Sequence, residues 1–233
     1  MRTGRLAQWV GFLMLFAAAA PSAVAQGNPR ITIFGGGSLL QGDRSFTVGS
    51  DNFTTEFITG GKLRARASFD VTSHWTLEGD YSFGRNNFRV NDMGGTPEQR
   101  DYGVRVNNVT FNLVRFFTAS RRRVRPYLGT GIGWVRYSPT DAAKALAQNE
   151  FIDAPSNLTS TNDFTVPISG GIEARITRWL GLRFDARDNI GRVARFGVSE
   201  TPSGPGGDFF PVNGITHTVQ VEVGIVFFLL PNE

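Results

Sequence analysis

The stretch from Val219 to Leu229 constrains the fold of this chain more than any other. It reads VQVEVGIVFFL, with an apolar residue at every odd position and with Gln220, Glu222 and Gly224 between them. A repeat of two residues is that of a β-strand with one apolar face. At about 3.3 Å per residue, the stretch has the length that a tilted strand needs to cross a bilayer. The apolar face carries no charge, so the sequence predicts a membrane-crossing strand.

The N-terminal 25 residues have the pattern of a signal peptide that is cleaved on export. Arg2 and Arg5 precede a short apolar core, and the small-residue motif at 23–25 fits a cleavage site. The apolar core at 9–20 is too short to span a membrane comfortably as a helix, so we favour cleavage over a helical anchor. We therefore predict two parts, a signal peptide at 1–25 and a β-barrel domain at 26–233.

Composition limits the class of protein further. The mature length fits one domain, and the absence of cysteine excludes disulfides and thiolate metal sites. The net charge of +4 falls to +2 without Arg2 and Arg5, which is too small to argue for nucleic acid as a partner. No apolar run after the signal peptide is long enough for a spanning helix, so a membrane protein with this sequence must cross as a closed sheet.

Eight segments have strand patterns, and the connections between them alternate in length. The predicted strands are residues 30–40, 57–71, 75–86, 102–117, 125–137, 164–177, 179–188 and 218–229. Short connections fall near 72–74, 118–123 and 178, whereas 41–56, 87–101, 138–163 and 189–217 are long. In outer-membrane barrels the short turns are periplasmic and the long loops extracellular. We therefore expect four long extracellular loops and both termini in the periplasm.

Most of these strands separate a polar face from an apolar one. In the strand at 125–137, for example, Tyr127 faces one way and Leu128, Ile132 and Trp134 face the other. The strand at 102–117 changes phase near Asn107 and Asn108, which predicts a β-bulge or a late start of the strand there.

Alternation alone does not say which face is inside, because a soluble lipocalin-type barrel also alternates. Two aromatic belts favour a transmembrane barrel over a soluble one, since membrane interfaces are enriched in aromatic residues. The belt at the short turns comprises Trp75, Phe116, Phe117, Trp179, Phe227 and Phe228, and that near the long loops comprises Phe57, Phe83, Phe88, Tyr102, Trp134, Tyr137 and Phe164. The charged faces also carry both signs and could neutralise one another in a narrow lumen. We therefore expect the apolar face to point outward.

The C-terminal strand resembles the assembly signal of outer-membrane proteins, which has a polar residue, a glycine and two alternating hydrophobic residues. Glu222, Gly224, Phe227 and Leu229 occupy those places, and residues 230–233 form an extension. Residues 30–229 resemble the small eight-stranded outer-membrane β-barrels of the OmpA/OmpX type. This resemblance implies an all-β, eight-stranded antiparallel up-and-down transmembrane β-barrel in a bacterial outer membrane. We expect a monomer whose partners are membrane lipid, including outer-leaflet lipid, and the outer-membrane assembly machinery.

The charged residues on the polar faces are the main candidate for a functional site. They are Lys62, Arg64, Arg66, Glu78, Asp80, Glu173, Arg175, Arg183, Asp185, Arg187 and Glu222. Eight strands leave an interior just wide enough for side chains to fill, where a charge is costly unless it is paired. We favour a structural plug of salt bridges over a gated path for ions or small solutes.

A catalytic reading finds little support. The two histidines, His74 and His217, lie near a short turn and before the last strand, and neither has a recognisable nucleophile. The glycine runs at 35–37 and 129–133 have no following helix, so they do not fit a dinucleotide site. We expect no catalysis, no cofactor, no metal and no nucleic-acid partner.

We therefore predict a non-catalytic outer-membrane barrel with a structural or surface-interaction role, in which the long loops contact an extracellular ligand. A narrow channel for small or hydrophobic solutes is the main alternative. An envelope-lipid-modifying enzyme and a soluble ligand-carrying barrel fit the sequence less well, the latter because its cavity should be lined by apolar residues.

Overall fold

The fold is known from a computed structural model, which describes residues 28–41, 44–48, 51–92, 99–150, 158–194, 196 and 214–230. The predicted signal peptide and its cleavage site lie outside the described residues.

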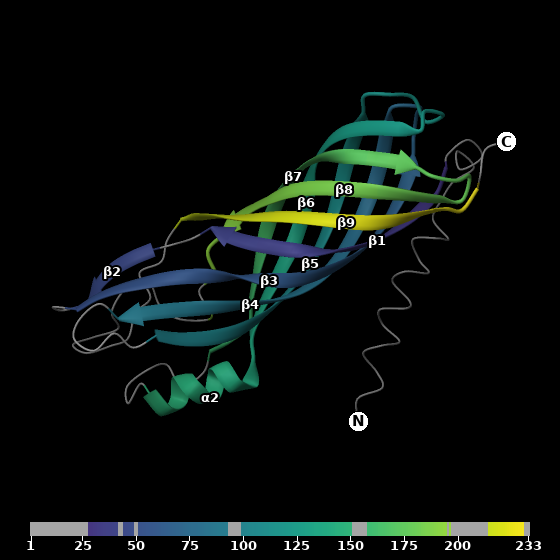
Figure 1. The fold of residues 1–233 in the computed structure, drawn as a ribbon. Helices are drawn as coiled ribbons and strands as arrows, with labels where there is room; N and C mark the ends of the chain where they lie inside the picture. The colour runs from purple at the N-terminus through teal and green to yellow at the C-terminus, as the bar shows by residue number, and fades with distance from the viewer. Residues whose placement is uncertain are drawn as a thin grey trace.

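Antiparallel strands dominate the described chain. In order they are β1 (Arg30–Gln41), β2 (Arg44–Val48), β3 (Asp51–Asp70), β4 (Trp75–Asp92), β5 (Gln99–Phe116), β6 (Val124–Pro139), α2 (Asp141–Glu150), β7 (Thr161–Arg175), β8 (Leu180–Arg192) and β9 (Ile215–Phe228). Each of the strands from β3 to β9 pairs with the next along the chain, and β1 pairs with both β3 and β9. These pairings close an eight-stranded up-and-down barrel, while β2 lies outside the closure and pairs with β3 (Figure 1). The predicted fold is confirmed.

The two ends of the barrel differ. The end with the connections at 71–74, 117–123 and 176–179 is called the short-turn end, and the opposite end the long-loop end. The strands differ most from the prediction at the long-loop end. At the long-loop end β3 and β4 continue as a paired ribbon to Phe53 and Asp92, and α2 occupies part of the predicted loop at 138–163. The loops predicted at 41–56 and 87–101 are therefore partly strand. At this end β2, β3, β4 and β5 are paired side by side, over residues whose Asn, Asp, Ser and Thr content is typical of loops.

The bulge or late strand start predicted near Asn107 and Asn108 is wrong, since β5 already begins at Gln99. β5 keeps one register with β4 and with β6 through these residues. The apparent phase change arises because the inward side chains of β5 change from polar at Asn108 to apolar at Val106. The register shift in this region lies instead between Ile58 and Gly61 of β3. Gly60 is needed there, because a Cβ atom at this position would collide with the carbonyl oxygen of Arg85.

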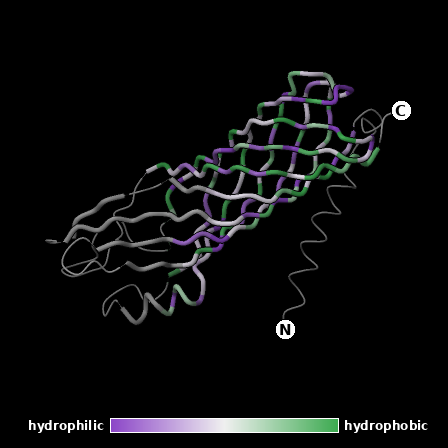
Figure 2. Tube along the Cα trace, in the orientation of Figure 1, coloured by the Kyte–Doolittle hydropathy of each residue, from purple (hydrophilic) through white to green (hydrophobic). Residues whose placement is uncertain are grey.

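Hydrophobic and hydrophilic residues alternate along the strands (Figure 2), and the large outward side chains are apolar while most of the buried inward ones are polar. Among the outward aromatic side chains, Trp75, Phe117, Trp179 and Phe227 lie near the short turns, and Phe83, Trp134 and Phe164 lie toward the long-loop end. The rings of Trp134 and Phe164 are cross-strand partners in an edge-to-face contact, with 5.9 Å between centroids. Among the described residues no helix is both long and apolar enough to cross a membrane.

Three predicted belt residues point the other way. Phe116, Phe228 and Tyr137 are buried inside the barrel, with exposed fractions of 0%, 3% and 5%. Adjacent residues of a strand face opposite sides, so only one member of each Phe–Phe pair can be outward. The side chains of Phe57, Phe88 and Tyr102 lie outside the described residues.

Candidate functional site: the barrel interior

The predicted charged residues meet inside the barrel. Ten of the eleven are buried side chains on the inner face: Lys62, Arg64, Arg66, Glu78, Asp80, Glu173, Arg183, Asp185, Arg187 and Glu222. Arg175 is the exception. It is only partly buried near the short-turn end, with its guanidinium carbon 4.1 Å from the centroid of the Phe228 ring. Arg175 shares the inward side of β7 with Glu173, so it lies at the edge of the interior, stacked on the inward Phe228 ring.

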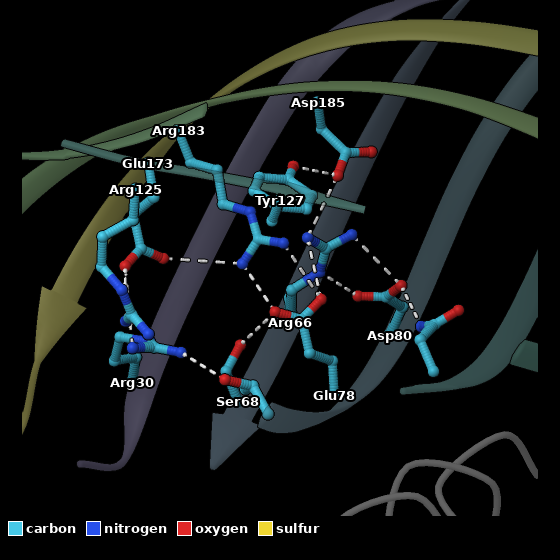
Figure 3. Close-up of polar contacts among 12 residues, drawn as sticks. Arg30, Arg66, Ser68, Glu78, Asp80, Arg125, Tyr127, Glu173, Arg183 and Asp185 are labelled. Carbon is cyan, nitrogen blue, oxygen red and sulfur yellow. Dashed lines mark hydrogen bonds and ion pairs between the residues drawn. The ribbon is translucent and has the colours of Figure 1, made fainter. Parts of the chain in front are cut away.

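Arg66 is the centre of the network (Figure 3). Its Nε atom lies 2.5 Å from Asp80 Oδ1, and its Nη1 atom lies 3.2 Å from both Glu78 Oε2 and Asp185 Oδ2. Arg183 contacts the other oxygen of Glu78, with Nη1 2.6 Å from Oε1. One carboxylate therefore joins two guanidinium groups, and the network links β3, β4 and β8 across the lumen.

The part of the network toward the long-loop end contains Arg64 and Arg187. Arg64 Nη1 lies 3.1 Å from Asp185 Oδ1. Its Nη2 lies 2.7 Å from Glu222 Oε2, as an ion pair without hydrogen-bond geometry. Arg187 Nη1 lies 2.8 Å from Asp80 Oδ2. The same oxygen of Asp80 accepts hydrogen bonds from neutral groups, Thr110 Oγ1 at 3.1 Å and Asn112 Nδ2 at 2.9 Å.

A second cluster near the short-turn end was not predicted. Arg30 Nη2 lies 2.7 Å from Asp70 Oδ1, and Arg125 Nη1 lies 3.5 Å from Glu173 Oε1. The guanidinium carbon of Arg125 stacks 3.8 Å from the centroid of the inward Phe116 ring, a favourable cation–π contact. Arg30 and Arg125 are the first residues of their predicted strands. At a strand end the alternation has neighbours on one side only, so it does not predict whether the side chain points inward or outward.

Tyr127 lies between the buried Phe116 ring and the charge network around Arg66. Its hydroxyl donates a hydrogen bond of 2.6 Å to Asp185 Oδ2, and the Arg183 guanidinium carbon lies 3.9 Å from its ring centroid. Its inward orientation confirms the prediction for the strand at 125–137. Gly171 leaves room for it, because a Cβ atom there would lie 2.6 Å from the Tyr127 hydroxyl.

A small cavity with both polar and apolar lining residues lies beside the network, toward the long-loop end. We call it the chamber. Its volume of about 20 Å³ is enough for a single water molecule. Asn, Gln, Ser and Thr side chains line it together with Lys62.

An apolar layer borders the chamber at the long-loop end. Val106, Val135 and Tyr137 belong to both the chamber wall and this layer. The layer also includes Ala143 of α2 and Phe196. From the short-turn end, the described part of the interior therefore has four zones: the second charged cluster, the network around Arg66, the chamber and the apolar layer.

The two histidines do not form a catalytic site with one another. His74 Nδ1 lies 2.9 Å from Ser73 Oγ in a short turn, whereas His217 Nδ1 lies 2.7 Å from Asp188 Oδ2 on β8 and β9 near the long-loop end. A hydroxyl–imidazole–carboxylate triad needs both contacts on one ring, and here they are divided between opposite ends of the barrel. The described residues include no group of three His, Cys, Asp or Glu side chains that could hold a metal ion.

Comparison with known proteins identifies the family. Residues 10–227 match the family described as outer membrane protein beta-barrel domain. The chain belongs to this family. Its barrel is therefore a bacterial outer-membrane barrel, and the apolar outer face is the lipid-facing surface.

Two solved outer-membrane barrels resemble the structure. Neisserial surface protein A is 13% identical, with a TM-score of 0.51 over 86% of this chain and 97% of that one. OprG from Pseudomonas aeruginosa is 12% identical, with a TM-score of 0.53 over 86% of this chain and 95% of that one. At such low identity the likeness shows the barrel fold alone. No curated protein matches the sequence.

Proposed function

We propose that this outer-membrane barrel is non-conducting and non-catalytic and has a structural or surface-interaction role at its long-loop end. The filled interior carries the proposal. Arg66, Arg183 and Asp185 lie at the centre of the lumen with exposed fractions of 0–1%. Their ion pairs join opposite walls, so a passing solute would have to separate buried charges, which is energetically costly.

The length of the strands supports a role for the long-loop end. A transmembrane strand needs about 9–11 residues, whereas β3 has 20 residues and β4 and β5 have 18 each. These strands are therefore longer than a bilayer crossing requires, and Figure 1 shows β3 and β4 continuing toward β2 at one end of the barrel. Such an extension presents a large surface to a partner outside the membrane.

Conductance in a planar bilayer tests the filled interior. We expect no stepwise current from the purified barrel. Reproducible current steps that disappear when the protein is omitted would contradict the proposal and favour the narrow channel instead.

The orientation can be tested because the chain has no cysteine of its own. Ser160 and Ser73 are exposed serines at the long-loop and short-turn ends. On intact cells, a membrane-impermeant maleimide should label Ser160→Cys and should label Ser73→Cys only after lysis. The reverse pattern would place the long-loop end in the periplasm and remove the basis for a surface role.

Contact with outer-leaflet lipid is part of the proposal. Arg85, Arg105 and Arg136 are exposed on the outer face, and two of them occupy the outward position next to Phe83 and Trp134 on the long-loop side. Arg85 and Arg105 are direct cross-strand partners, an arrangement of like charges that is unfavourable without a counter-anion. Lipid phosphates at the headgroup level would supply that anion.

A further inference from the structure

The buried charges inside the barrel do not balance. Among the described residues, seven buried cationic side chains face six buried carboxylates. The cations are Arg30, Lys62, Arg64, Arg66, Arg125, Arg183 and Arg187, and the carboxylates are Asp70, Glu78, Asp80, Glu173, Asp185 and Glu222. One buried positive charge is therefore left without a matching carboxylate.

Lys62 is the residue that carries the excess. Each of the six buried arginines has at least one carboxylate contact, whereas Lys62 forms no ion pair with any carboxylate in the described part of the chain. Lys62 and Glu222 lie on either side of Gly36 in the sheet, but the ion pair of Glu222 is with Arg64. Only 7% of the Lys62 residue is exposed, so bulk solvent does not compensate its charge.

The surroundings of Lys62 have the chemistry of an anion site. It lines the chamber, where the other polar side chains are amides and hydroxyls and none is a carboxylate. Asn108 and Asn189, each 6% exposed, also line the chamber. The Oδ1 atom of Asn108 and both amide atoms of Asn189 are buried without hydrogen-bond partners. Of these three atoms the Nδ2 atom of Asn189 is a donor and the two Oδ1 atoms are acceptors, so the Lys62 ammonium group and the Asn189 amide NH2 group are the donors that an anion would use.

We propose that the chamber binds a small monovalent anion of the size of chloride beside the Lys62 ammonium group. The volume of about 20 Å³ fits a particle of about the size of water and favours a small halide over sulfate, phosphate or an organic acid. A lysine suits this task because its charge is compact, whereas the planar guanidinium of arginine suits the carboxylates of the network. This binding site goes beyond the structural or surface role proposed above.

Anion exchange during folding tests the site. The barrel is refolded in detergent in sodium chloride, sodium bromide or sodium gluconate at equal ionic strength, and its thermal midpoint is measured from the mobility shift on gels. We expect chloride and bromide to raise the midpoint in a saturable way relative to gluconate, which is too large for the chamber. Crystals grown in bromide should show an anomalous peak beside Lys62 Nζ.

Two lysine variants locate the effect, because Lys62 and Lys144 are the only lysines of the chain. Lys62→Met should abolish the difference between chloride and gluconate, whereas Lys144→Met on α2 should retain it. Equal midpoints of the wild-type barrel in all three salts, or a difference that persists in Lys62→Met, would overturn the proposal. If Lys62→Met does not fold, the bromide peak in the wild-type crystal decides, and its absence would overturn the proposal.

Discussion

Arg66 and Asp80 are direct cross-strand partners on β3 and β4, and their side chains meet inside the barrel with 2.5 Å between Nε and Oδ1. Arg66 also contacts Glu78 and Asp185, so a single guanidinium group neutralises parts of three carboxylates from two strands. Removing it would leave several buried negative charges undercompensated.

Arg66→Ala should therefore destabilise the barrel by about 3–5 kcal/mol, the usual effect of breaking a buried ion pair. Urea unfolding in detergent measures the change. Arg122→Ala, at an exposed position in a short turn, is the control and should change stability by less than about 0.5 kcal/mol. An unchanged unfolding midpoint for Arg66→Ala would show that the network does not support the fold.

Gly36 and its neighbour Gly35 provide a matched test of interior packing. A Cβ atom on Gly36 would lie 2.7 Å from Glu222 Cγ and would collide with the Val221 carbonyl oxygen, whereas a Cβ atom on Gly35 would meet nothing within 4 Å. Gly36→Ala should cost about 1–3 kcal/mol, as overpacking does, and Gly35→Ala should change stability by less than about 0.5 kcal/mol. Similar unfolding free energies for the two variants would contradict the tight packing at Gly36.

The alternation of the sequence predicted the membrane-spanning part of the barrel well, because one face of each strand there contacts lipid and the other faces the barrel interior. Lipid selects Leu182 and Ile225 on the outside, and the charge network selects Arg183 and Glu222 on the inside. Toward the long-loop end β3 and β4 are rich in Asn, Asp and Thr, which are typical of loops, so part of these strands was predicted to form loops.

The partners within the interior could not be predicted from the sequence. Arg183 and Glu78 are 105 residues apart and meet only because the barrel closes. Phe116 was predicted to face lipid, since a sequence does not separate an aromatic ring in a membrane belt from one that stacks on arginine. The strict alternation of a strand did imply that Phe116 and Phe117 face opposite ways, although not which of them is inside.

A charge on the lipid-facing surface should be costly in proportion to its depth. Leu182 is outward on β8 with 43% exposure, and Leu230 lies just beyond β9. Leu182→Arg should cost about 2–4 kcal/mol in lipid vesicles if it lies near the midplane, whereas Leu230→Arg near the interface should cost about 0–1 kcal/mol. Equal unfolding free energies for the two variants would place Leu182 away from the membrane centre.

The adjacent residues Phe227 and Phe228 can separate assembly from stability. Phe227 belongs to the proposed assembly signal and is outward with 44% exposure, whereas Phe228 is inward with 3% exposure. Phe227→Ala should lower the fraction of barrel inserted in cells while refolding in detergent is retained. Phe228→Ala should lose about 3–5 kcal/mol of stability, as buried phenylalanine truncations do.

Gel mobility with and without heating measures insertion in the cell membrane fraction, and urea unfolding measures stability. Normal insertion of Phe227→Ala would remove Phe227 from the signal. The inward members Glu222 and Gly224 contact interior groups, since Glu222 pairs with Arg64 and a Cβ atom at Gly224 would lie 2.6 Å from Phe34 Cδ1. Variants at these two positions would therefore change both the assembly signal and the interior packing. Phe227 is the better probe because it faces outward.

The outward arginines should retain lipid phosphate. Replacing Arg85 and Arg105 together by glutamine removes two opposed positive charges and should lower the phosphorus that co-purifies with the barrel from outer membranes. Arg115→Gln is the control, because Arg115 is outward on the same strand as Arg105 but lies near the short turns, beside Trp75. Equal phosphorus in the double variant, the control and the wild-type barrel would show that these cations are compensated by something other than lipid. A loss confined to the double variant would instead place the headgroups of the outer leaflet at the level of Arg85 and Arg105.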